Sequence, residues 1–155
     1  MDWTIFIILF GACAAAATTG AMFQPGAWYD SLDKPDWTPP DWVFPVAWST
    51  LYVAMCIAGA RVSGAEGAGI ALAFWALQIA LNTLWTPIFF GLRRMRAALA
   101  VIAALWLAVA ACMVTHFRID TIAGLLFAPY LLWVTIAAAL NTSVWRRNPD
   151  VESIS

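Results

Sequence analysis

Aromatic side chains and single hydrogen-bonding groups recur at helical spacing in three apolar stretches of the chain. Residues three or four positions apart lie on one face of a helix. The residues that share a face are Trp48 with Tyr52; Gln78 with Asn82, Trp85 and Phe89; and Pro129 with Trp133, Ala137 and Asn141. Each face combines flat aromatic surface with a polar group. This combination suits the binding of a planar, mostly apolar ligand whose polar edge is oriented by an amide such as that of Asn82.

The same spacing has a purely structural interpretation. Gln78, Asn82 and Asn141 would then join neighbouring helices by hydrogen bonds, and the tryptophans would fill the core. Spacing alone does not decide between a ligand site and a packed core.

An aromatic belt at the membrane interface explains only some of the ten tryptophans. Trp3, Trp42 and Trp145 lie at the ends of apolar stretches, where such a belt is expected. Trp48, Trp85 and Trp133 lie further inside and need another explanation.

Five uncharged stretches are each long enough to cross about 30 Å of hydrocarbon as a helix. They comprise residues 3–23, 42–60, 67–92, 97–117 and 121–145. Hydrophobic residues make up 63% of the chain and charged residues 11%, against about 25% charged in globular proteins. We therefore expect an all-α integral membrane protein, with residues 1–155 forming a single five-helix domain and an ordered loop at residues 24–41.

The basic residues indicate an orientation. An odd number of spans places the two termini on opposite sides of the membrane. One side then carries Lys34, Arg93, Arg94, Arg96, Arg146 and Arg147, and the other carries Arg61 and Arg118. By the positive-inside rule, the first group is expected to be cytoplasmic, with the N-terminus outside and the C-terminus inside.

Few groups suit catalysis or metal binding. Cys13, Cys56 and Cys112 lie in separate stretches without paired spacing, and we interpret them as small buried hydrophobes. His116 ends the fourth stretch, where its ring is expected to reach interfacial water; haem ligation is the less favoured interpretation. No metal site and no nucleic-acid partner is expected. The lack of charge inside the stretches disfavours ion-coupled transport but leaves passive carriage open.

Small residues predict a homodimer contact on the third stretch. Gly69 with Ala73, and Ala76 with Ala80, have the spacing that lets two helices approach closely. Their face differs from the face that carries Asn82.

Prolines and aromatic residues predict a stiff lid over one end of the bundle. Residues 24–41 hold four prolines together with Tyr29 and Trp37. Pro87 and Pro129 fall inside apolar stretches, where they predict bends. Such bends either open a cavity near one end or only aid packing.

A spaced pattern of tryptophan and proline resembles the signature of the tryptophan-rich sensory protein family. This TspO/MBR group includes the mitochondrial translocator protein, or peripheral-type benzodiazepine receptor. The first block is Trp28-Tyr29-x-x-Leu32-x-Lys34-Pro35-x-Trp37-x-Pro39-Pro40-x-Trp42, continued by Phe44-Pro45-x-x-Trp48-x-x-Leu51-Tyr52. Later blocks are Gln78-x-x-x-Asn82-x-x-Trp85-x-x-x-Phe89-Phe90 and Pro129-Tyr130-x-x-Trp133, with Asn141. The pattern covers essentially the whole chain.

The resemblance implies a commonly dimeric bundle that binds porphyrins, haem and benzodiazepine-type ligands beneath the first loop. The implied pocket comprises Tyr29, Trp37, Trp48, Tyr52, Asn82, Trp85, Phe89, Trp133 and Ala137. Trp48 and Asn82 would form hydrogen bonds with the ligand. Trp133 would take part in any light- and oxygen-dependent porphyrin breakdown. No other catalytic residue and no required cofactor is implied.

The resemblance also implies a role. Bacterial members are regarded as sensors tied to tetrapyrrole metabolism and stress, with passive tetrapyrrole transport as the alternative. The bacterial inner membrane is the favoured location, and the outer membrane stays open.

Two departures from the family's patterns limit what is carried over. The sterol motif of the animal proteins needs a basic residue soon after its tyrosine, but the first one after Tyr130 is Arg146, so the motif is not matched. In the loop, Lys34 is surrounded in sequence by Asp30, Asp33, Asp36 and Asp41. This negative balance disfavours capture of porphyrin propionates by the loop.

Overall fold

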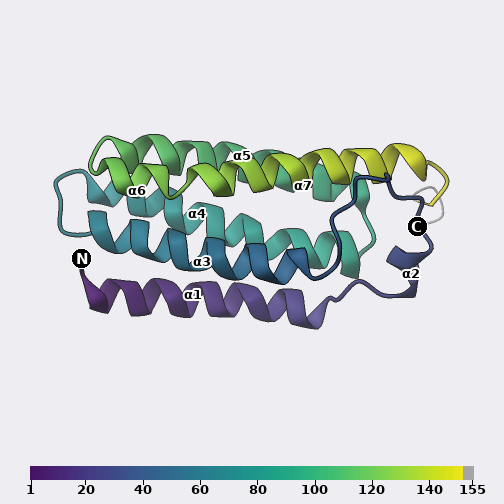
Figure 1. Cartoon of the computed structure of the whole chain (residues 1–155), viewed down its shortest axis with the longest axis horizontal. Helices are drawn as coiled ribbons and strands as arrows, with labels where there is room; N and C mark the ends of the chain where they lie inside the picture. Colours follow the sequence, from purple (N-terminus) through teal and green to yellow (C-terminus); the bar gives the residue numbers. More distant parts are fainter. Residues whose placement is uncertain (152–155) are drawn as a thin grey trace.

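The computed structural model describes residues 1–151 and places five long helices side by side in one bundle (Figure 1). They are α1 (Trp3–Met22), α3 (Val43–Val62), α4 (Ala68–Thr86), α5 (Met95–Phe117) and α7 (Ala128–Arg147). Three short elements adjoin their ends: α2 (Ala27–Asp30), the π-helix η1 (Pro87–Gly91) and α6 (Thr121–Leu125). Five helical spans are long and apolar enough to cross a membrane. The prediction of an all-α, five-span membrane protein is confirmed.

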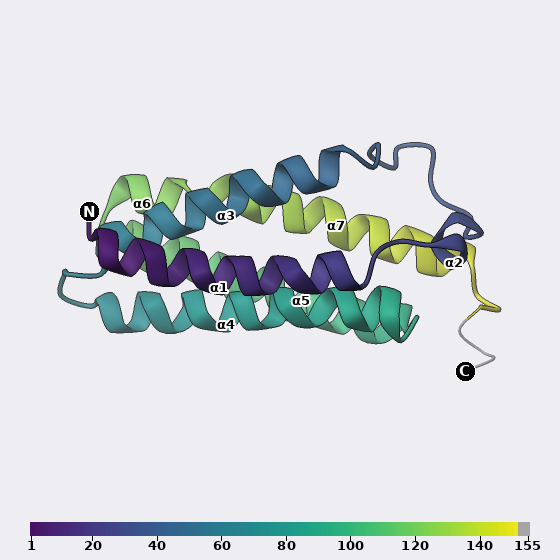
Figure 2. The same ribbon diagram turned by 90° about the horizontal axis from the view of Figure 1, so that it is seen from below.

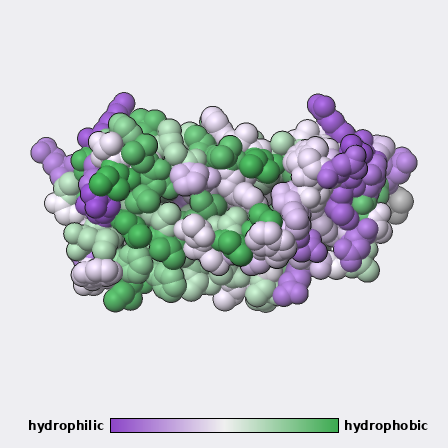
Figure 3. Space-filling view, viewed as in Figure 1, coloured by the Kyte–Doolittle hydropathy of each residue, from purple (hydrophilic) through white to green (hydrophobic). Residues whose placement is uncertain are grey.

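The two ends of the bundle differ from its middle in polarity. Strongly hydrophilic residues gather at both ends in the space-filling view (Figure 3). Along α1, apolar side chains such as Ile7, Ile8 and Phe10 are exposed, as they would be against lipid. The start of α1 lies at one end, and the end of α7 lies at the other, near α2 (Figures 1 and 2). We call the latter the loop end.

Asp2 fixes the start of α1. Its carboxylate accepts hydrogen bonds from the backbone N–H groups of Thr4 at 2.9 Å and Ile5 at 3.2 Å. Such a cap satisfies backbone donors that have no partner inside the helix. The backbone N–H of Asp2 also donates to the carbonyl of Ala60 at 3.1 Å, which ties α1 to the end of α3.

An ion pair joins α3 to α6 at the same end. The Arg61 guanidinium donates twice to the Asp120 carboxylate, from Nε at 3.1 Å and from Nη2 at 2.7 Å. Asp120 also accepts from the backbone N–H of Ala123 and so caps α6. The hydrogen bond from Arg61 holds the pKa of the Asp120 carboxyl below its usual value. The turn between α5 and α6 is therefore anchored to α3.

Each of the two prolines lies at the start of a helical element. Pro87 begins η1, in which the N–H of Leu92 donates to the Pro87 carbonyl at 2.8 Å. Pro129 lies in the first turn of α7, after a break at Leu126 and Phe127. Proline is tolerated in the first turn of a helix, because the N–H that it lacks would have no partner there. The third and fifth predicted helices are thus each two elements, and α5 starts two residues before the predicted position 97.

The close approach of α6 to α5 depends on Gly124. A Cβ at this position would lie 2.6 Å from Cα of Phe117. We expect Gly124→Ala to lower the free energy of unfolding by about 1 kcal/mol, the lower end of the cost of overpacking, because α6 is short and can shift. Gly69→Ala in α4 is the control, because no atom lies within 4 Å of its Cβ position. Thermal unfolding in mild detergent measures both, and equal destabilisation would contradict the close approach.

Part of the long loop belongs to the core at the loop end. Tyr29 and Leu32 are buried and pack in a cluster with Phe89 of η1, Met95 of α5 and Val144 of α7. A larger cluster fills the rest of the bundle and draws on all five long helices. The loop is therefore held against the bundle through α2.

Candidate functional site

A chain of hydrogen bonds links α3, α4 and α7 in the interior. Tyr52 Oη donates to Asn82 Oδ1 at 3.0 Å, and Asn82 Nδ2 donates to Tyr130 Oη at 3.2 Å. Tyr130 Oη donates to Gln78 Oε1 at 2.9 Å. We call these four residues the polar chain. Asn82, Gln78 and Tyr130 are all buried, so each hydrogen bond satisfies groups that lack water.

Aromatic rings surround the polar chain. The Trp48 ring lies 5.7 Å from the Tyr52 ring and 5.9 Å, edge to face, from the Tyr130 ring. On α7, the Trp133 ring meets Phe44 of α3 edge to face at 5.6 Å. These distances are those of favourable aromatic pairs. Residues from the start of α3 and the start of α7 thus form one aromatic wall beside the polar chain.

Trp133 differs from the other residues of this wall in its hydrogen bonding. Its indole Nε1 is buried and has no hydrogen-bond partner among the described residues. A buried donor without a partner costs about 1–3 kcal/mol. Trp133 follows Tyr130 by three positions on α7, so the unpaired N–H lies about one helical turn from the polar chain.

A second aromatic group lies toward the loop end. Trp85 stacks on Phe89 with ring centroids 5.0 Å apart and planes 18° apart. Tyr29 meets Phe90 edge to face at 5.4 Å. The Trp85 indole N–H donates to Asn141 Oδ1 at 3.2 Å. The indole N–H of Trp85 therefore has a hydrogen-bond partner, whereas that of Trp133 has none among the described residues.

Lys34 and Asp33 anchor the loop. Lys34 Nζ donates to the Tyr29 carbonyl at 2.8 Å and lies 4.6 Å above the Tyr29 ring. Burial, and then the charges of nearby aspartates, raise the pKa of the Tyr29 hydroxyl. Asp33 exchanges two hydrogen bonds with Asn148, through its backbone N–H at 3.0 Å and its carbonyl at 2.9 Å. Lys34 and Asp33 thus hold the loop to itself and to the end of α7.

The nine sequence-predicted residues divide into three sets. Trp48, Tyr52, Asn82 and Trp133 lie around the polar chain, with half-buried Ala137 one turn beyond Trp133. The second aromatic group holds Tyr29, Trp85 and Phe89. Trp37 stands apart and is 52% exposed. Trp85 packs against both core clusters and so connects the first two sets.

Sequence reasoning left two members of the polar chain out of the predicted site. Gln78 shares a helix face with Asn82, and Tyr130 belongs to a spaced motif, but neither is among the nine predicted residues. The spacing of Gln78 to Asn82 by four, and of Tyr130 to Trp133 by three, is the signal that places both beside the site. Phe44, which packs on Trp133, carries the same kind of signal through its spacing of four from Trp48.

His116 differs from its expected setting. It was expected to reach interfacial water, but it is fully buried against Phe127 with ring centroids 4.7 Å apart. Its Nδ1 lies 2.8 Å from the Cys112 carbonyl. Cys13 and Cys56 have their sulfur atoms 3.6 Å apart and, like Cys112, are free and buried. Among residues 1–151, no group of three or more His, Cys, Asp or Glu side chains is placed to hold a metal ion.

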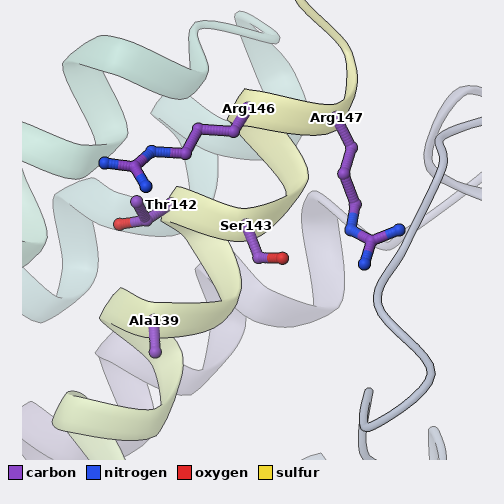
Figure 4. Close-up of a pocket in the computed structure, with 5 residues that line it drawn as sticks. All are labelled: Ala139, Thr142, Ser143, Arg146 and Arg147. Atoms are coloured by element: carbon purple, nitrogen blue, oxygen red, sulfur yellow. The ribbon is translucent and has the colours of Figure 1, made fainter.

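A hollow of about 440 Å³ lies elsewhere, on the outer side of α7 (Figure 4). It is lined by Ala139, Thr142, Ser143, Arg146 and Arg147, none of which belongs to the predicted site. Around the polar chain, by contrast, the rings and amides contact one another.

The fold and the site together define a five-span membrane protein with an aromatic and amide-lined interior. The sequence model of the TspO/MBR family matches residues 4–146. The chain belongs to this family.

Similar proteins come from bacteria and animals. Protein CrtK of Rhodobacter capsulatus is 57% identical, over 100% of this chain and 99% of that protein. The tryptophan-rich sensory protein of Cereibacter sphaeroides is 55% identical, over 96% of this chain and 94% of that protein. The translocator protein of Homo sapiens is 40% identical, over 78% of this chain and 75% of that protein. Recognition of the family from the spaced motifs is confirmed.

Proposed function

We propose that this protein is a membrane sensor or receptor that binds porphyrin or haem beside the polar chain, between α3, α4 and α7. Benzodiazepine-type ligands would take the same site. The observation that carries the proposal is the buried, unpartnered Trp133 N–H within an aromatic wall. A ligand with an acceptor atom on its edge satisfies this donor, and the rings stack on its faces. The names of two relatives, a tryptophan-rich sensory protein and a translocator protein, support the sensor or receptor part of the proposal.

The first half of α3 is the wall that moves to admit the ligand. All buried residues of α3 lie between Leu51 and Val62, so Val43–Thr50 has no fully buried side chain. Segments with few buried contacts open at low free-energy cost. Movement of this half separates Trp48 and Phe44 from α7 and makes room beside Asn82.

The remaining predicted residues have distinct roles in the proposal. Trp48 and Tyr52 stack on the ligand, and the Asn82 amide orients its polar edge. Trp85 and Phe89 continue the aromatic surface toward the loop end. Tyr29 and exposed Trp37 belong to the loop that covers the site once the ligand is bound.

Quenching of tryptophan fluorescence by protoporphyrin IX, in nanodiscs, tests the site. We expect Trp133→Phe and Asn82→Ala each to weaken binding about tenfold, the equivalent of one hydrogen bond of about 1.4 kcal/mol. Trp106→Phe is the control, because the Trp106 indole donates to Thr135 at 2.9 Å and faces outward from α5. If both site variants bind as tightly as the parent while the control does too, the site assignment is wrong.

Passive carriage of tetrapyrroles is the second candidate. The spans carry almost no charge in their interior and so offer no ion-coupling group, which disfavours ion-coupled transport but leaves passive carriage open. Flux of protoporphyrin IX into proteoliposomes separates a carrier from a sensor.

Illumination in air tests whether Trp133 also supports porphyrin breakdown, an activity that Trp133→Phe would remove.

A homodimer through α4 is proposed as the assembly. Gly69, Ala73, Ala76 and Ala80 are exposed on the single chain, and no atom lies within 4 Å of the Gly69 Cβ position. This small-residue face is therefore open to a second copy. Crosslinking in bilayers that yields only monomer would contradict it.

The proposed location is the bacterial inner membrane, with the loop end cytoplasmic. The six basic residues assigned to one side lie in connections and helix ends at the loop end (Figures 1 and 2). A reporter fused after Arg147 is expected to be active only in the cytoplasm.

A further inference from the structure

The hollow on α7 lies along one face of the helix. Thr142, Ser143 and Arg146 follow Ala139 by three, four and seven positions, which places all four on one face of the helix. The small side chain of Ala139 leaves room for the hollow, which is also lined by the hydroxyl residues Thr142 and Ser143. The guanidinium groups of Arg146 and Arg147 extend on opposite sides of Thr142 and Ser143 (Figure 4). We call this hollow the α7 groove.

The α7 groove lies at the boundary between the apolar surface and the loop end. Below it on α7, Leu132 is 63% exposed and Thr135 is also exposed, so this face meets lipid. Toward the end of α7, the Arg96 guanidinium lies 5.3 Å from the centroid of the Trp145 ring. A tryptophan beside a basic residue is typical of the membrane interface. A molecule in the groove would thus have one end at the membrane surface and the other along the hydrocarbon.

The α7 groove is positively charged and only weakly compensated. None of the ion pairs among residues 1–151 involves Arg146, whose side chain is exposed. Arg147 lies 3.6 Å from Asp33, with both side chains largely in solvent. Such an exposed pair is weak and yields to a stronger anion. Guanidinium groups donate well to phosphate oxygens, so two of them beside small hydroxyl residues favour a phosphate group as the occupant.

We propose that the α7 groove binds the headgroup of an anionic phospholipid. Arg146 and Arg147 hold the phosphate from either side, and the Ser143 hydroxyl donates to one of its oxygens. The acyl chains extend along Ala139, Thr135 and Leu132. This lipid site is separate from the interior site and does not depend on the proposed porphyrin binding.

Native mass spectrometry of the detergent-solubilised protein tests the lipid site by titration with phosphatidylglycerol and phosphatidylcholine. We expect phosphatidylglycerol to bind more tightly, and Arg146→Gln to weaken it about fivefold, the effect of one basic residue near an anionic headgroup. Ser143→Phe fills the groove without changing the charge and is expected to remove the preference. Arg94→Gln, at the same end of the bundle, is the matched control and should keep it. Arg118→Gln, at the opposite end, should keep it as well.

Three outcomes would overturn the lipid site. The first is an equal loss in Arg94→Gln and Arg146→Gln, which would reveal general attraction by the basic end. The second is displacement of phosphatidylglycerol by millimolar inorganic phosphate, which would make the groove a free-anion site. The third is an unchanged lipid preference in Arg146→Gln. The apparent Tm of each variant shows whether it is folded, and Arg146→Gln alone decides if Ser143→Phe does not fold.

Discussion

Replacing Tyr130 with phenylalanine is expected to lower the free energy of unfolding by about 2 kcal/mol. The Tyr130 hydroxyl donates to Gln78 and accepts from Asn82, and all three side chains are buried. Tyr130→Phe therefore leaves an acceptor and a donor without partners in an interior that water does not reach. Hydrogen bonds between membrane helices average about 0.6 kcal/mol, with the strongest near 1.7. Each of the two lost bonds leaves a buried group without a partner, so we take about 1 kcal/mol for each, above the average.

Unfolding of the detergent-solubilised protein by SDS measures this loss. Tyr52→Phe is the matched control, since it deletes the same atom from a half-buried side chain that forms a single bond, to Asn82. Its cost is expected to be about 0.6 kcal/mol. If the two variants are equally stable, the polar chain does not hold α4 and α7 together, and the hydroxyl of Tyr130 is dispensable.

The same variants separate stability from binding. Tyr130→Phe frees the Asn82 amide, so a bound ligand can accept the hydrogen bond that Tyr130 accepted. Binding of protoporphyrin IX should then fall less than the stability does. Trp133→Phe should behave in the opposite way, because it removes a donor that has no partner in the protein. Contrasting changes in these two variants would distinguish residues that hold the bundle from residues that hold the ligand.

Most of the fold could be predicted from the sequence because hydrocarbon imposes length and lack of charge on every span. The five predicted spans correspond to helices whose ends shift by only a few residues. The prolines at positions 87 and 129 predict an irregularity in these spans, but the sequence does not show that it takes the form of a change of helix type or a break. Apolarity is the same on both sides of such a break, so hydropathy does not reveal it.

The interior site was less predictable than the fold. Helical spacing places Trp48 with Tyr52 and Gln78 with Asn82, but it cannot say which faces of different helices meet. The pairing of Asn82 with Tyr130, and of Phe44 with Trp133, depends on how the helices are rotated within the bundle. That rotation is set by packing across helices that are distant in sequence.

The burial of His116 also could not be predicted from helical spacing. Its position near the end of α5 suggested contact with water, yet α6 folds back through Asp120 and Gly124 and covers that end. The break that creates α6 was the feature hidden in the sequence. One missed boundary therefore changed the expected surroundings of a residue on another helix.

Asn141→Ala is expected to cost about 3 kcal/mol, the largest effect of a single substitution in the bundle. The Asn141 amide accepts the Trp85 indole N–H at 3.2 Å and donates to the Met95 carbonyl at 3.1 Å, so one side chain joins α4, α5 and α7. Truncation loses both bonds, leaves the Trp85 donor unpaired and opens a small cavity where the amide was. The apparent Tm should fall accordingly.

A double-mutant cycle isolates the bond between Asn141 and Trp85. Trp85→Phe removes the donor, and the double variant removes both partners together. Because the second substitution can no longer break the bond, the double variant should be about 1 kcal/mol more stable than the sum of the single losses predicts. Purely additive losses would show that Asn141 acts through Met95 and α5 alone. In that case the aromatic group formed by Trp85 and Phe89 would be positioned by ring packing, and the loop end would tolerate movement of α4 against α7.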